Sequence, residues 1–194
     1  MNPSTDSADQ AESPLPDVAV LDACVLLNLF ASRRVEEILA SLPFRCLVAS
    51  QVRREALWYL GASDKDDDRL QRHEIVLDPL IAAGRIQVAE LTVDEEGLLV
   101  ELAQNLGDGE AASGALAIGR AAFVATDDVK AVRVFRQLEP PLRTAGTPTL
   151  LRWWEERSGA SASAITSTLQ AIRRGARFSP RADAADASWW RDRS

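Results

Sequence analysis

Short apolar runs alternate with amphipathic segments along most of the chain. Residues 18–21 are apolar without interruption, which is typical of a strand buried on both faces of a parallel sheet. Similar runs predict strands at residues 44–48, 122–125 and 142–145, and a short edge strand at 85–89. Because strands that alternate with helices pair in parallel, the pattern predicts an α/β fold with helices on both faces of the sheet.

Start and stop signals divide the remaining segments into helices. Ser50 is a plausible N-cap for a helix over residues 51–60, Thr92 and Glu95 form a capping box, and Pro148 suits the first turn of a helix. Residues 61–72 are mostly charged and are expected to form a loop or a helix end. Further helices are predicted up to residue 29 and at 35–40, 74–83, 108–121, 128–136, 150–157 and 164–174.

The domain boundaries follow from composition. Residues 1–16 are rich in Ser, Asp and Pro and lack apolar periodicity, so we expect a disordered leader. Residues 17–159 are expected to form one domain. After Gly159 the pattern loosens, and residues 160–194 are expected to hold a C-terminal helix and a polar tail.

Cysteine and histidine are too scarce for most metal or nucleophilic sites. Cys24 and Cys46 each lie in an apolar run without a CxxC pattern, and His73 is the single histidine. Both cysteines are expected to stay reduced and behave as small apolar residues. Metal chemistry would therefore rest on carboxylates, which favour hard ions such as Mg²⁺ or Mn²⁺.

The formal net charge of −7 bears on possible partners. An acidic chain does not attract a polyanion as a whole, so a nucleic-acid substrate would need a local basic patch or a basic partner. The sequence shows neither a secretion signal nor an apolar run long enough to cross a bilayer. The expected compartment is the cytoplasm, with no membrane partner.

Three aspartates stand where ligands bind in a parallel sheet, at the carboxyl ends of strands. Asp22 ends the first predicted strand, and Asp127 and Asp128 follow the strand at 123–125. Each of them is equally well explained as the cap of the next helix. Beside them, Thr126 is expected either to orient these acids or to cap its strand.

Two glutamates complete a candidate acidic rim. Glu55 falls at the edge of the apolar stripe of its predicted helix, where an unpaired carboxylate costs free energy. Glu110 lies in the first turn of a helix rich in Ala and Gly, which is able to pack close to the sheet. The alternatives are a salt bridge for Glu55, and for Glu110 an ordinary first-turn acid behind Asp108 as N-cap.

Four ordered motifs resemble the PIN-domain family, the ribonuclease fold of many bacterial toxin–antitoxin toxins. They are Val20-Leu21-Asp22-Ala23-Cys24-Val25-Leu26-Leu27, Val52-Arg53-Arg54-Glu55, Gly107-Asp108-Gly109-Glu110-Ala111 and Val124-Ala125-Thr126-Asp127-Asp128. The stretch Gly175-Ala176-Arg177-Phe178-Ser179-Pro180 is similar to the tail of a subgroup that has a Gly-x-Gly-Glu-Ala third motif. The resemblance covers about residues 17–181.

The resemblance implies a three-layer α/β/α sandwich with a central parallel sheet of four or five strands. It also implies RNA cleavage that depends on Mg²⁺ or Mn²⁺, a small antitoxin as partner, and a homodimer. The implied catalytic acids are Asp22, Glu55, Glu110 and Asp127 or Asp128, with metal held by Asp22, Glu110, Asp127 and Asp128. Arg53 and Thr126, which stand beside these acids in the sequence, are the expected substrate contacts.

One departure from the family keeps an alternative function open. Cys24 stands where the family usually has Ser or Asn, so a hydrogen-bonding group beside the first acid is expected to be missing. A PIN-like protein that acts by binding rather than cutting therefore remains an alternative. A phosphatase of the haloacid-dehalogenase type is disfavoured, because the sequence has Asp22-Ala23-Cys24 where that class needs Asp-x-Asp.

Overall fold

The computed structural model describes residues 16–54, 58–62 and 70–194. Its centre is a five-stranded sheet in the order β5-β2-β1-β6-β7, in which every neighbouring pair is parallel. The strands are β1 (Val18–Leu21), β2 (Arg45–Ala49), β5 (Gln87–Ala89), β6 (Phe123–Ala125) and β7 (Thr144–Ala145). This confirms the expected parallel sheet, including the short edge strand.

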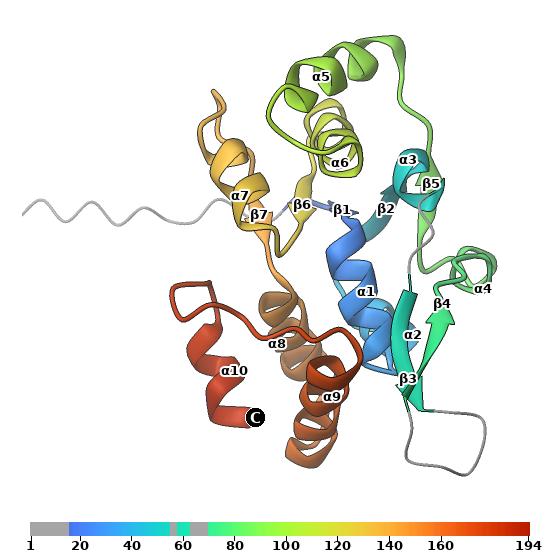
Figure 1. The fold of residues 1–194 in the computed structure, drawn as a ribbon, viewed down its shortest axis with the longest axis vertical. Coiled ribbons are helices and arrows are strands. Elements are labelled where there is room, and N and C mark those ends of the chain that lie inside the picture. The colour runs from blue at the N-terminus through green and yellow to red at the C-terminus, as the bar shows by residue number, and fades with distance from the viewer. Residues whose placement is uncertain (1–15, 55–57, 63–69) are drawn as a thin grey trace, which may run out of the picture.

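Helices cover both faces of the sheet, so the molecule is the expected α/β/α sandwich (Figure 1). One layer holds α5 (Val93–Ala103), α6 (Asp108–Gly119) and α7 (Val129–Arg136), and the other holds α1 (Ala23–Ala31), α2 (Val35–Ser41), α8 (Thr147–Ser158) and α9 (Ala162–Gly175). The remaining helices are α3 (Ser50–Arg54), α4 (Asp78–Ala82) and α10 (Ala187–Arg193).

The small residues of α6 bring this helix close to the sheet and to its neighbours. Ala111, Ala112 and Ala115 are fully buried, and α6 contacts β1, β2 and β6. A Cβ atom added to Gly114 would meet Phe135 of α7 at 2.5 Å and Leu102 of α5 at 2.9 Å. The close packing predicted from the Ala- and Gly-rich sequence is confirmed, and it sets the start of α6 beside the ends of the strands.

The structure corrects the predicted helix over residues 51–60. Helix α3 covers only Ser50–Arg54, and Trp58–Ala62 forms β3, which pairs antiparallel with β4 (Leu70–Glu74). Tyr59 stacks on its cross-strand neighbour His73, with ring centroids 5.3 Å apart. Aromatic residues suit a strand when such a partner lies opposite, and this pairing outweighs the helical spacing of the apolar residues.

Two further boundaries differ from the prediction. The helix expected at 74–83 is confined to α4, because Pro79 lacks the N–H of a helix interior and stands in the first turn. The C-terminal stretch, expected to hold one helix and a polar tail, contains a second helix, α10. Trp189 and Trp190 of this helix are 8% and 1% exposed, so they pack within the chain.

No helix in the described part of the chain is long and apolar enough to cross a membrane.

Candidate metal-binding active site

Asp22 lies where β1 passes into α1, at the carboxyl edge of the sheet. Its backbone N–H donates to the carbonyl of Ala125 on β6 at 3.0 Å, which fixes the end of β1 against its neighbour. Its Oδ1 accepts from the N–H of Ala23 at 2.8 Å as the cap of α1. Asp22 is only 3% exposed, so its carboxylate is held in one orientation at the strand end.

Thr126 and Cys24 both hydrogen-bond to the second carboxylate oxygen of Asp22. The Thr126 hydroxyl donates to Asp22 Oδ2 at 2.8 Å, and the Cys24 thiol donates to the same oxygen at 3.1 Å. Thr126 thus orients this acid, as one of its two expected roles requires. The expectation that Cys24 leaves Asp22 without a neighbouring donor is wrong, because the thiol takes that place.

The chemistry of Cys24 matches a donor rather than a nucleophile. Burial raises the pKa of its thiol far above the ordinary value, and the negative charges of Asp22 and Asp127 raise it further. The thiol therefore stays protonated and keeps its proton for Asp22. Its sulfur also accepts from the backbone N–H of Asp127 at 3.2 Å, which links the first and the last acidic motif.

Asp127 is held by hydrogen bonds from α1 and α8, two helices of the same layer. Its Oδ1 accepts from the N–H of Thr147 at the start of α8, and its Oδ2 accepts from Asn28 Nδ2 on α1, both at 2.8 Å. The Thr147 hydroxyl also donates to Oδ2. Burial raises the pKa of Asp127 and the charge of Asp22 adds to this, although the hydrogen bonds from Thr147 and Asn28 oppose it. A cation beside the two carboxylates would relieve this cost.

Asp128 has the capping role that the sequence left open. Its Oδ1 accepts from the N–H of Ala131 at 2.7 Å, as the N-cap of α7. Its own N–H donates to the Thr126 hydroxyl at 3.2 Å. The two adjacent aspartates therefore differ, since Asp127 is held by side chains of other elements and Asp128 by its own helix.

Glu110 stands in the first turn of α6, whose N-cap is Gly107 rather than the expected Asp108. A Cβ atom on Gly107 would overlap Oε2 of Glu110. The carboxylate therefore folds back over the start of its own helix, in space that only glycine leaves free. The positive end of the helix dipole favours an anion there.

These groups face one cleft of about 590 Å³ at the carboxyl edge of the sheet. Its walls come from the ends of β1 and β6, the start of α6 and the segment after α9, which contributes Arg177 and Phe178. Five acids line the cleft: Asp22, Asp108, Glu110, Asp127 and Asp128. The structure thus brings together four of the five predicted catalytic acids from three motifs.

The donor set suits a hard divalent cation. It consists of carboxylates with hydroxyl and amide groups behind them, and the charge of the buried Asp22 acts against ionisation of the partly buried Asp127. Within the described residues, no group of three or more Asp, Glu, His or Cys side chains is placed so that it could hold a metal ion together. The fifth predicted acid, Glu55, lies outside the described residues.

Arg53 and Asn28 differ from what the sequence led us to expect. Arg53, an expected substrate contact, pairs with Asp78 at 2.7 Å and does not line the cleft. Asn28 was not singled out from the sequence, although it holds Asp127. Its partner Asp127 lies 99 positions away in the sequence. The one sequence feature that could have pointed to Asn28 is that it is an amide side chain inside an otherwise apolar helix.

Comparison with known protein families gives a match that spans the whole acidic cleft. A sequence model of the PIN domain matches residues 18–183, which include every acid of the cleft. No curated protein matches the chain. Since the family match covers most of the chain, the protein belongs to the PIN-domain family, whose members are generally nucleases.

Proposed function

We propose that the protein is a metal-dependent endoribonuclease that cleaves RNA phosphodiester bonds in the acidic cleft. The observation that carries the proposal is the arrangement around Asp22 and Asp127. The buried carboxylate of Asp22 and the partly buried one of Asp127 come from neighbouring strand ends. They are held in place by Thr126, Cys24, Asn28 and Thr147, and they open into a cleft that also contains Glu110. Holding two negative charges close together costs free energy, and such an arrangement is typical of a cation site.

In this proposal Asp22, Glu110 and Asp127 hold Mg²⁺ or Mn²⁺, with Asp128 beside them. A bound ion would supply Lewis-acid activation of water and would neutralise charge on the phosphate. The chain contributes the orientation of the ligands. Thr126 and Cys24 orient Asp22, and Asn28 and Thr147 orient Asp127, so that these two carboxylates are already positioned before an ion binds.

Cleavage of a labelled single-stranded RNA, with and without Mg²⁺ or Mn²⁺, tests the proposal. We expect metal-dependent cleavage by the parent protein and a loss of more than about 100-fold in Asp22→Asn and Glu110→Gln, since even outer partners of metal ligands contribute 10–100-fold. Glu101→Gln, an exposed acid on α5, is the matched control and should cut as the parent does. Equal cleavage by the parent and by both site variants would refute the proposal.

The expected biological setting extends this proposal. We propose a toxin that is neutralised by a small antitoxin, acts as a homodimer and works in the cytoplasm. The support is the resemblance of the motifs to toxin ribonucleases. Induced expression in a bacterium tests it, because a toxin should arrest growth and Asp22→Asn should not. Unimpaired growth with the active parent would contradict the toxin role.

A further inference from the structure

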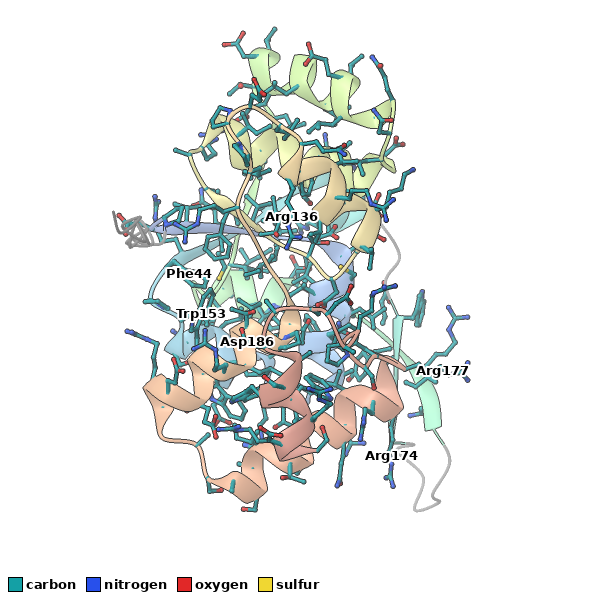
Figure 2. All side chains as sticks on the ribbon, turned by 90° about the vertical axis from the view of Figure 1, so that its left-hand side faces the viewer. Phe44, Arg136, Trp153, Arg174, Arg177 and Asp186 are labelled. Carbon is teal, nitrogen blue, oxygen red and sulfur yellow. The ribbon has the colours of Figure 1, made fainter. Side chains whose placement is uncertain are left out.

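A second groove lies directly beside the acidic cleft. It has a volume of about 500 Å³ and runs between α7, the end of β7 and the segment after α9. Asp127 and Phe178 line both hollows, so the two are neighbours that share a wall. Figure 2 shows Arg136 of α7 above the C-terminal segment that leads from Arg177 to Asp186.

The groove has the opposite charge from the cleft. Arg133 and Arg136 from α7 and Arg181 from the C-terminal segment line it, with Asp183 as its second acid besides Asp127. Arg181 pairs with Asp183 at 3.1 Å. Arg133 and Arg136 are exposed, and no carboxylate in the described part of the chain pairs with them. In a chain of net charge −7, two unpaired guanidinium groups in one groove are a local basic site.

The other walls are apolar and include an aromatic ring. Val129, Val132, Pro148 and Ala184 line the groove together with Phe178. The ring of Phe178 is held edge-on against Trp190, with centroids 5.6 Å apart. Phosphate contacts from arginine and a firmly held aromatic ring are the two elements by which proteins bind single-stranded nucleic acid. The volume falls within the range of sites for small molecules.

We propose that this groove binds a nucleotide that flanks the scissile phosphate of a single-stranded RNA. Arg133 and Arg136 contact its phosphates, and its base packs against Phe178. The groove meets the cleft at Asp127 and Phe178, so a strand bound in both passes over this shared wall. The location next to a scissile bond rests on the proposed function, whereas RNA binding in the groove does not require cleavage.

Binding is measured in EDTA, where metal-dependent cleavage cannot occur, with a fluorescent single-stranded RNA between 25 and 200 mM salt. The logarithm of the affinity falls with the logarithm of the salt concentration by about 0.7 for each phosphate contact to a single strand. Arg133→Ala and Arg136→Ala should each reduce this slope by about 0.7 and weaken binding. Arg45→Ala is the control, because it removes an equal charge from the amino end of β2, whereas the acidic cleft lies at the carboxyl ends of the strands. It should leave the slope unchanged.

A variant of Phe178 separates stacking from charge. Phe178→Leu keeps an apolar side chain against Trp190 but removes the aromatic face. We expect it to weaken RNA binding about tenfold without changing the salt slope, because stacking releases no counterions. A strictly duplex RNA should bind worse than the single strand, because its bases are not free to enter the groove.

The outcomes distinguish this inference from the proposed function. Unchanged slopes in Arg133→Ala and Arg136→Ala, or equal losses in Arg45→Ala, would overturn the inference while cleavage in the acidic cleft remained possible. An absence of RNA binding by the parent at 25 mM salt would overturn it as well. Reduced slopes in the two groove variants of a protein that never cleaves RNA would support the groove and refute the nuclease.

Discussion

Cys24 shows how one side chain reverses an expectation drawn from a motif. A cysteine in place of Ser or Asn looks like the loss of a hydrogen-bonding group, yet its thiol donates to Asp22 at 3.1 Å. Burial and the charges of Asp22 and Asp127 raise the thiol pKa, so the proton remains available for this contact. Asp22, directly after β1, is thus positioned by the sulfur of Cys24 together with the hydroxyl of Thr126.

Substitution of Cys24 tests this positioning role. Cys24→Ala should lower kcat/KM for RNA by about 3- to 10-fold, the equivalent of one lost hydrogen bond of about 1 kcal/mol. Cys24→Ser should restore most of the activity, because its hydroxyl can donate to the same oxygen. An equal loss in both variants would show that Cys24 contributes only packing, and thermal unfolding of each variant supplies the control.

Asp127 and Asp128 are expected to respond differently to substitution. Asp127→Asn should weaken Mn²⁺ binding at least about tenfold, because it removes a charge that Asn28 and Thr147 hold at the cleft. Asp128→Ala should chiefly cost about 1 kcal/mol of stability, the usual effect of losing a helix N-cap. Mn²⁺ titration and denaturant unfolding measure the two effects, and the reverse pattern would make Asp128 the metal ligand.

Gly107 is predicted to matter because of the carboxylate beside it. Gly107→Ala introduces a Cβ atom into the position of Glu110 Oε2 and should displace this carboxylate, while the φ of −71° suits alanine. We expect weaker Mn²⁺ binding and lower activity with an intact fold by circular dichroism. Gly97→Ala on α5, where a Cβ meets nothing within 4 Å, is the control and should bind metal normally. Unchanged metal binding in Gly107→Ala would remove Glu110 from the site.

At the scale of elements, two charged residues of α8, Glu155 and Arg152, hold the C-terminal segment. Glu155 accepts from Trp189 Nε1 at 2.7 Å and from Arg193 Nε at 2.9 Å. Arg152 of the same helix pairs with Asp186 at 2.8 Å. These contacts hold α10 beside Phe178, and Phe178 in turn forms the wall between the cleft and the basic groove.

The contribution of Glu155 should depend on pH. Burial opposes its ionisation, but the hydrogen bonds from Arg193 and Trp189 and the charge of Arg193 bring its pKa below the ordinary 4.5. A lowered pKa in the folded state stabilises the protein above that value, and this stability is lost as the pH falls through the lowered pKa. Glu155→Gln should therefore cost about 1 kcal/mol at pH 7, where solvent screens this partly exposed pair, and less at pH 3. Urea unfolding at both pH values measures the difference, and an equal cost at both would contradict the ionic role.

At the scale of the whole molecule, the parts that the sequence predicted are those governed by local rules. Strands such as β1 and β6 are buried on both faces, so their apolar runs are continuous and easily recognised. Because all five strands of the sheet are parallel, Asp22 and Asp127 necessarily meet at one edge. The strand ends and the motif order therefore predicted where the acidic cleft forms.

The remaining features depend on pairs of residues that are distant in sequence. The antiparallel pair β3 and β4 includes the stacking of Tyr59 on His73, and the position of Asp127 depends on Asn28 and Thr147. Helix α10 is fixed by the burial of Trp190 and the bond from Trp189 to Glu155. No periodicity within one segment encodes such partners, so a single sequence did not predict them.

The most direct test of the account is a crystal structure of the protein soaked in Mn²⁺, with anomalous density measured in the acidic cleft. The account predicts a peak between Asp22 and Glu110, about 2.1 to 2.2 Å from carboxylate oxygens of Asp22, a distance slightly longer than that of Mg²⁺. The peak should disappear in Asp22→Asn and persist in Glu101→Gln. A cleft without anomalous density at saturating Mn²⁺, or an ion bound only elsewhere, would contradict the claim that these acids form a metal-dependent nuclease site.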